Sequence, residues 1–225
     1  ILEIATKEIG KIGDDLFSYG KEGIQKLARW FDDIGIFRKA VDIGVDTTRW
    51  SDDAIKGLDE FVQGSPIRQD AGKKIARVAK EGAEEAFENM NKLRSRGVVG
   101  IDKIEEKIIR STDGELTGYL FEIKAASRSS HADEVVEVSH AVRSGGRDIT
   151  DFDAILNDNS ILEFKSGNPA KDVILDKITK LTNAVRMEGR GGIRFVFENT
   201  PFSDVITVLN NAVSKGDIIG WEVLT

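Results

Sequence analysis

The second half of the chain contains a short hairpin whose charged residues can meet on one side of a sheet. Its two strands and the turn between them are predicted at residues 149–156, 160–165 and 157–159. Because residues i and i+2 of a strand project to the same face, Glu163 and Lys165 should lie side by side. Asp153 should lie next to Glu163 in the paired register. We therefore expect two carboxylates and a lysine to converge there.

Two neighbouring carboxylates repel each other unless a positive charge lies between them. A hard divalent cation completed by water is the obvious candidate, so we predict a Mg²⁺ site with Asp153 and Glu163 as ligands; Mn²⁺ and Zn²⁺ are alternatives. Such a cation lowers the pKa of a bound water and neutralises charge that builds on a phosphoryl oxygen. Lys165 could orient the attacking water or stabilise the transition state. This set suits phosphodiester hydrolysis; the alternative is an ordinary set of cross-strand ion pairs.

Residues 111–225 alternate between helical and strand patterns. Helices are predicted at 114–127, from Pro169 to about Gly189, and at 203–213; strands are predicted at 135–142, 149–156, 160–165, 193–197 and 218–224. Asn168 is best explained as the N-cap of the second helix. The order helix, three strands, helix, strand, helix, strand predicts an α/β sandwich with a mixed sheet.

Residues 1–110 show helical spacing and no alternating pattern, which predicts an all-α domain. Ser65 and Pro66 indicate a helix start, as N-cap and first helical residue, and this helix should run to about residue 95. A further short helix is predicted at 101–109. We thus predict two domains, a helical one at 1–110 and an α/β one at 111–225.

The composition argues against several classes of protein and site. With 40% hydrophobic and 32% charged residues, the 225-residue chain is typical of a folded protein. A net charge of −7 does not suit a protein that coats nucleic acid through bulk charge. The absence of cysteine excludes disulfides and thiolate sites, and two histidines are too few for a histidine-built zinc site. No apolar run approaches the roughly 20 residues that span a bilayer, so we expect no stable membrane insertion.

Asp153, followed after a hairpin by the Glu-x-Lys of residues 163–165, resembles the core of the PD-(D/E)XK nuclease superfamily. The element order of residues 111–225, about half of the chain, is similar to that fold. The resemblance implies that Asp153, Glu163 and Lys165 form a catalytic set. The chain departs from the family pattern at Phe152, where a proline often precedes the aspartate.

The resemblance also implies a glutamate from the first helix of the α/β domain. Glu122 stands at the matching place and is our candidate, and Glu115 is its competitor. Glu122 and Lys124 form a second Glu-x-Lys, but their neighbours predict a helix. We interpret Asp151 as a strand-edge charge rather than a ligand, and His140 as structural.

A helical segment ahead of such a domain is similar to the C-terminal toxin regions of contact-dependent growth inhibition and related polymorphic toxins. The resemblance implies an N-terminal module that assists entry and a cognate immunity protein that blocks the active site. The chain starts at Ile1 without a methionine or a signal-peptide pattern, so we interpret it as a piece of a longer polypeptide. It would be secreted or delivered from a cell surface and would act in the cytoplasm of the target cell.

The function predicted from the sequence is therefore a metal-dependent nuclease toxin. An acidic nuclease domain slightly favours a compact, shape-read RNA such as tRNA over long duplex DNA. One alternative is a catalytically inactive module that keeps the fold for binding proteins. Another is a housekeeping nuclease of DNA repair or recombination.

Overall fold

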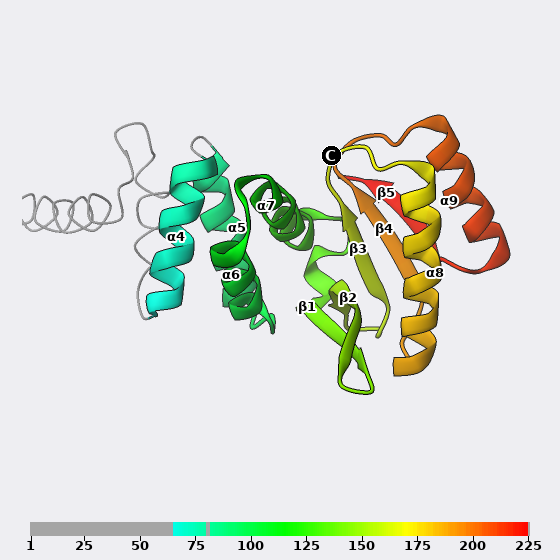
Figure 1. Cartoon of the computed structure of the whole chain (residues 1–225), viewed down its shortest axis with the longest axis horizontal. Helices are drawn as coiled ribbons and strands as arrows, with labels where there is room; N and C mark the ends of the chain where they lie inside the picture. Colours follow the sequence, from blue (N-terminus) through cyan, green and yellow to red (C-terminus); the bar gives the residue numbers. More distant parts are fainter. Residues whose placement is uncertain (1–64, 80–81, 225) are drawn as a thin grey trace, which may run out of the picture. The chain divides into compact units, whose positions relative to one another are not determined.

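The fold is described from a computed structural model, which covers residues 65–79 and 82–224 (Figure 1). Predictions that fall on residues 1–64 lie outside the described residues. The helices are α4 (Pro66–Ala79), α5 (Ala83–Ser95), α6 (Ile101–Arg110), α7 (Asp113–Arg128), α8 (Lys171–Glu188) and α9 (Ser203–Lys215), with a 3-10 turn, η2 (Ala132–Glu134). The strands are β1 (Val135–Ser144), β2 (Arg147–Leu156), β3 (Ile161–Lys165), β4 (Ile193–Phe197) and β5 (Gly220–Val223).

The strands form one mixed sheet in the order β1-β2-β3-β4-β5. The first three strands are antiparallel hairpin neighbours, whereas β3, β4 and β5 run parallel. Parallel neighbours need crossover connections, which α8 and α9 supply. The predicted α/β class with a mixed sheet is therefore confirmed, and β3 lies at the centre of the sheet.

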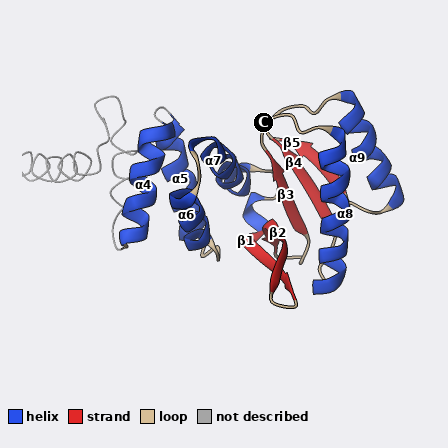
Figure 2. Cartoon of the chain, in the orientation of Figure 1, coloured by secondary structure: helices blue, strands red, loops and turns tan. Residues whose placement is uncertain are grey.

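Helices cover both faces of the sheet. In Figures 1 and 2, α7 lies on one side of β3, and α8 and α9 lie on the other. The core under α8 and α9 is built from aromatic residues of the sheet and an aliphatic stripe of α8: Phe152, Phe195, Phe197, Ile174, Ile178 and Leu181. Burial of each such side chain contributes roughly 1.5–3 kcal/mol to folding. This layer fixes α8 on the sheet, and with it every side chain that α8 presents there.

Two local predictions about helix boundaries are wrong. The segment after Pro66 is not one helix, because α5 has its own start at Ala83, with Gly82 as N-cap. Glycine costs a helix interior about 1 kcal/mol relative to alanine, so Gly82 is a natural place for an interruption. Asn168 is not a cap either: α8 begins two residues after Pro169, with Ala170 extended (ψ 153°) as its N-cap. The fixed φ of proline suits extended backbone as well as a first helical turn.

The helix α6 begins where its backbone touches β1. Val99 forms an isolated parallel bridge with Glu137, and the Val138 N–H donates to the Val99 carbonyl at 2.8 Å. The next residue, Gly100, has a φ of 89°, and a Cβ at this position would lie 2.1 Å from the Val138 carbonyl oxygen. Only glycine fits this approach. The start of α6 is thus held against the sheet by backbone contacts.

The described residues all belong to one compact unit, which runs across the predicted domain boundary at residue 110. Helices α4, α5 and α6 contact α7, and α6 also contacts β1. The Lys74 ammonium donates to the carbonyl of Ile109 at 3.0 Å, which joins α4 to the end of α6. Independent folding of residues 111–225 stays a prediction.

These contacts give that prediction a measurable form. We expect a fragment of residues 111–225 to melt at a lower temperature than one of residues 66–225, because removal of α4, α5 and α6 exposes apolar surface of α7. Circular dichroism of both fragments during heating measures the difference. Equal melting temperatures would support a boundary at residue 110, and an unfolded shorter fragment would contradict it.

Candidate active site

The hairpin of β2 and β3 brings Asp153 and Glu163 together. Its paired register includes Ala154 opposite Leu162 and Ile155 opposite Ile161, so the next step along the strands places the two acidic residues opposite each other. The Asp153 carboxylate accepts a hydrogen bond of 2.6 Å from the Phe164 N–H. Both acidic residues are buried, Asp153 at 8% and Glu163 at 0% relative exposure. Such carboxylates need compensating charge.

Glu163 has two cationic partners, and both contact the same oxygen. Lys165, two residues along β3, is bonded to Oε1, and Lys177 of α8 lies 3.2 Å from the same atom. The other oxygen, Oε2, is buried without a hydrogen-bond partner among the described residues. An unpartnered buried acceptor costs roughly 1–3 kcal/mol or more. Oε2 is therefore an oxygen that can ligate a cation.

Glu122 of α7 joins the same group of charges. It is half-buried, and its electrostatic neighbours include Asp151, Glu163 and Lys165. Burial, together with the carboxylates of Asp151 and Glu163, raises the pKa of Glu122 to about 7, although Lys107 and Lys165 oppose this rise. A carboxyl group that titrates near neutrality can accept or donate a proton at physiological pH.

The other site groups show the same shortage of positive charge. Burial raises the pKa of Asp153 well above its ordinary value, and the charges of Glu163 and Glu122 raise it further. Burial alone would lower the pKa of Lys165, but the carboxylates of Glu163 and Asp153 outweigh this effect and raise it. A cation bound among these carboxylates would oppose the upward shifts of the acids.

Asp151 lies beside this group but has its own cation. Lys107 of α6 is 2.7 Å from the Asp151 carboxylate and lies 5.9 Å from the centre of the Tyr119 ring. Burial would raise the pKa of Asp151, but the hydrogen bond and charge of Lys107 outweigh it and lower the pKa. Asp151 is therefore ionised and paired.

Sequence reasoning missed both Lys107 and Lys177. Each lies three residues after a buried isoleucine and immediately before another: Ile104 and Ile108 in α6, Ile174 and Ile178 in α8. Residues three apart share a helix face, so both lysines stand on the buried stripe of their helix. A lysine inside an apolar stripe indicates a buried partner, and this was the available signal.

The remaining candidates lie outside the carboxylate group. Glu115 is exposed and forms a capping box with Thr112, whose N–H donates to the Glu115 carboxylate at 2.7 Å. Lys124 pairs with Glu85 at 3.1 Å, so only Glu122 of the second Glu-x-Lys joins the carboxylate group.

His140 is held between two glutamates. Its two ring nitrogens lie 2.9 Å from the Glu137 carboxylate and 3.0 Å from that of Glu188. The ring also stacks on Phe152, with centroids 5.9 Å apart. These contacts join β1 to the end of α8, which is consistent with a structural role for His140.

The contrast between the two glutamates of α7 predicts different effects on activity. Glu122→Gln should lower any hydrolytic activity of this site at least tenfold, because it removes a charge and a titrating group from the site. Glu115→Gln should change the rate by less than about twofold, because this side chain caps the helix away from the site. Initial rates of both variants measure this, and the reverse order of effects would assign the site to Glu115.

The residues present fit a Mg²⁺ ion held by few protein ligands. In residues 65–79 and 82–224, no three His, Cys, Asp or Glu side chains are grouped as a ready-made metal site. Mg²⁺ usually keeps several waters and needs only one or two carboxylates. Asp153 and Glu163, with the unpartnered Oε2, meet that requirement.

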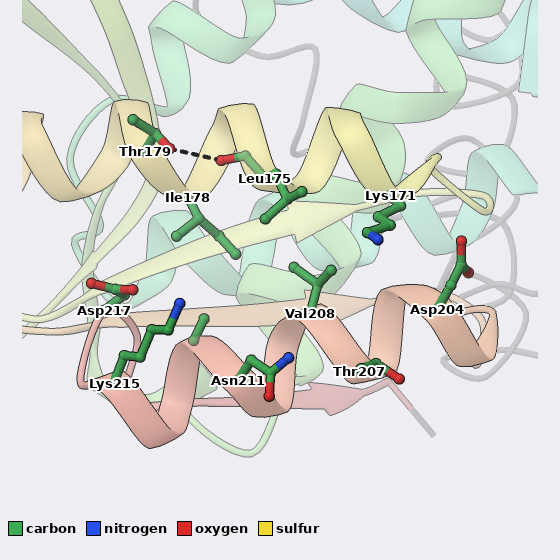
Figure 3. Close-up of a pocket in the computed structure, with 11 residues that line it drawn as sticks. Lys171, Leu175, Ile178, Thr179, Asp204, Thr207, Val208, Asn211, Lys215 and Asp217 are labelled. Atoms are coloured by element: carbon green, nitrogen blue, oxygen red, sulfur yellow. Dashed lines mark hydrogen bonds between the residues drawn. The ribbon is translucent and has the colours of Figure 1, made fainter.

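A separate hollow lies between α8 and α9. Figure 3 shows that it is lined by Leu175, Ile178 and Val208, with Lys171 and Lys215 toward its ends. It contains none of the predicted site residues.

No helix in the described part of the chain is long and apolar enough to cross a membrane.

Comparison of the chain with family models, curated proteins and solved structures finds no match.

Proposed function

We propose that the protein is a metal-dependent nuclease with a PD-(D/E)XK-like site, which hydrolyses phosphodiester bonds in nucleic acid. The observation that carries the proposal is the fully buried carboxylate of Glu163, which has one free oxygen and lies beside Asp153 and Lys165. Burial of this charge is costly for a structure that does not use it. The element order from α7 to β5 supports the same family.

Each residue has a defined role in this proposal. Asp153 and Glu163 would hold the cation, which when bound lowers the pKa of a coordinated water and neutralises charge on the phosphoryl oxygen. Lys165 would stabilise the negative charge of the transition state. Glu122 of α7, beside these groups, could take a proton from the attacking water or give one to the leaving group.

The substrate and the biological setting extend this proposal. The net charge of −7 favours a compact RNA such as tRNA slightly over duplex DNA, because phosphate affinity must come from local patches. Delivery as a toxin of the contact-dependent growth inhibition or polymorphic type, with an immunity protein that blocks the site, rests on the resemblance in architecture alone.

Incubation of the full chain with total RNA and with plasmid DNA, each with Mg²⁺ or with EDTA, tests the proposal. Cation-dependent cleavage of either substrate is the expected result, and the cleaved substrate identifies the class. Mn²⁺ and Zn²⁺ should be compared with Mg²⁺ in the same assay. No cleavage with any of the three cations would contradict the proposal.

A non-catalytic binding module is the second candidate, since the pairing of Glu163 with two lysines also describes a satisfied structural ion pair. Calorimetric titration of Mg²⁺ separates the two functions. A nuclease should bind Mg²⁺ and lose this binding in Asp153→Ala, whereas a binding module should show no dependence on Asp153.

A further inference from the structure

Two lysines contact the same oxygen of Glu163. Lys165 and Lys177 both contact Oε1, while Oε2 is buried without a partner. Asp153 beside it adds a second buried carboxylate, so the two lysines face two buried acidic groups. Glu163 nevertheless contacts both ammonium groups, and the two lysines are held in different ways.

Lys177 is anchored from outside the strand. It projects from α8, where the neighbouring Ile174 and Ile178 are buried against the sheet. Its ammonium also lies 3.4 Å from the Thr150 hydroxyl of β2. With two partners and a packed helix behind it, Lys177 has little freedom to leave Glu163.

Lys165 has fewer contacts than Lys177. It is the last residue of β3, and Gly167, two residues later, has a left-handed φ of 67°. Among the side chains of the described residues, Glu163 is the only hydrogen-bond or ion-pair partner of its ammonium. Lys165 is thus held at the end of a strand by a single ion pair.

We propose that Lys177 is the positioning residue that keeps the Glu163 carboxylate paired and in place, so that Lys165 can leave it and bind a phosphate oxygen of the substrate. The inference rests on the proposed nuclease function and adds to it a separate role for each of the two lysines. Lys165 contacts substrate, whereas Lys177 acts only through Glu163.

Kinetics of the full chain, on whichever of total RNA or plasmid DNA it cleaves with Mg²⁺, test this division. Lys177→Met should lower kcat about tenfold or more with a smaller change in KM, because Lys165 then stays on Glu163. Lys177→Arg should restore the rate to within about threefold, since arginine keeps the charge and reach. Lys180→Met is the matched control on α8, where Lys180 is exposed and pairs with Asp176; its rate should be unchanged.

The double variant distinguishes positioning from direct contact. At saturating Mg²⁺, where the cation pairs with Glu163, Lys165→Met with Lys177→Met should be no slower than Lys165→Met alone if Lys177 acts by releasing Lys165. Multiplied losses would show that Lys177 has its own contact with substrate and would overturn the inference. Wild-type rates for Lys177→Met would overturn it too, while cleavage that still needs Asp153 would leave the proposed function standing.

Thermal unfolding tests the shared hold on Glu163 without any activity. Each single methionine variant leaves Glu163 one partner, so the double variant should lower the melting temperature by more than the sum of the two. Adding Glu163→Gln to the double variant should recover most of this loss. Additive losses, or no recovery, would overturn the role of Lys177. If the wild type cleaves neither substrate, the proposed function and the release of Lys165 are both contradicted. Thermal unfolding then still tests whether Lys177 keeps Glu163 paired.

Discussion

Asp153→Asn should lower cation-dependent cleavage by about 100-fold or more while the protein stays folded. The substitution removes a charge that would hold the cation, yet an amide oxygen can still accept the hydrogen bond of the Phe164 N–H. Lys165→Ala and Glu163→Gln should each cause a loss of similar size, because the three side chains act as one unit. Initial rates, with circular dichroism of each variant, measure both parts of the expectation.

The matched control for Asp153→Asn is Asp148→Asn on the same strand. Asp148 is exposed and pairs with Arg143 at 2.7 Å, away from the carboxylate group. This control should keep the wild-type rate. Near-wild-type cleavage by a folded Lys165→Ala protein would contradict the catalytic assignment. Equal losses in both aspartate variants would indicate a general effect of charge.

Without a divalent cation, Glu122 should make the protein less stable as the pH rises. Its pKa is about 7 in the folded state, against 4.5 for an ordinary glutamate, so the folded state holds this proton more tightly. The resulting stability is fully present below about pH 4.5 and is lost as the pH rises through 7. A shift of this size corresponds to on the order of 3 kcal/mol. Asp153, whose pKa is also raised, acts in the same direction.

Urea unfolding at pH 5 and pH 8 measures this effect when wild type is compared with Glu122→Gln. The comparison is needed because Asp151 and Glu115 have lowered pKa values. These two groups make the protein more stable as the pH rises, which opposes the effect of Glu122. Glu122→Gln should be more stabilising at pH 8 than at pH 5. The same difference between variant and wild type at both values would contradict the assignment.

Mg²⁺ should reverse the loss at high pH. Fewer protons compete for the carboxylate oxygens at pH 8 than at pH 5, so the cation should raise the melting temperature of the wild type more at pH 8. Asp153→Asn should abolish most of the rise at pH 8. A rise that is equal at both values would place the cation elsewhere on the protein.

The meeting of Asp153 and Glu163 could be predicted because it depends on local geometry alone. Two strands joined by a short turn must pair, and their register follows from the length of the turn. The alternation of side chains along β3 then fixes Glu163 and Lys165 on one side. The same locality explains why the order of strands and helices from α7 to β5 was accessible.

Two other lysines of the site were not accessible in this way. Lys107 and Lys177 reach it only because α6 and α8 pack on the sheet at particular positions, and no local pattern gives those positions. The interruption at Gly82 and the late start of α8 were missed for a related reason. Helical periodicity continues across Gly82, and Pro169 suits both a helix start and an extended segment, so tertiary packing decides each case.

The position of Lys107 in the site depends on the close approach of Gly100 to Val138, a backbone contact that involves no charge and no substrate. Lys107 lies two turns along α6 from that contact, so the distance between two backbones sets how far its ammonium reaches toward Asp151. A single methyl group at residue 100 would have to push the helix away from β1. The chemistry of the carboxylates thus depends on a place where the chain has no side chain at all.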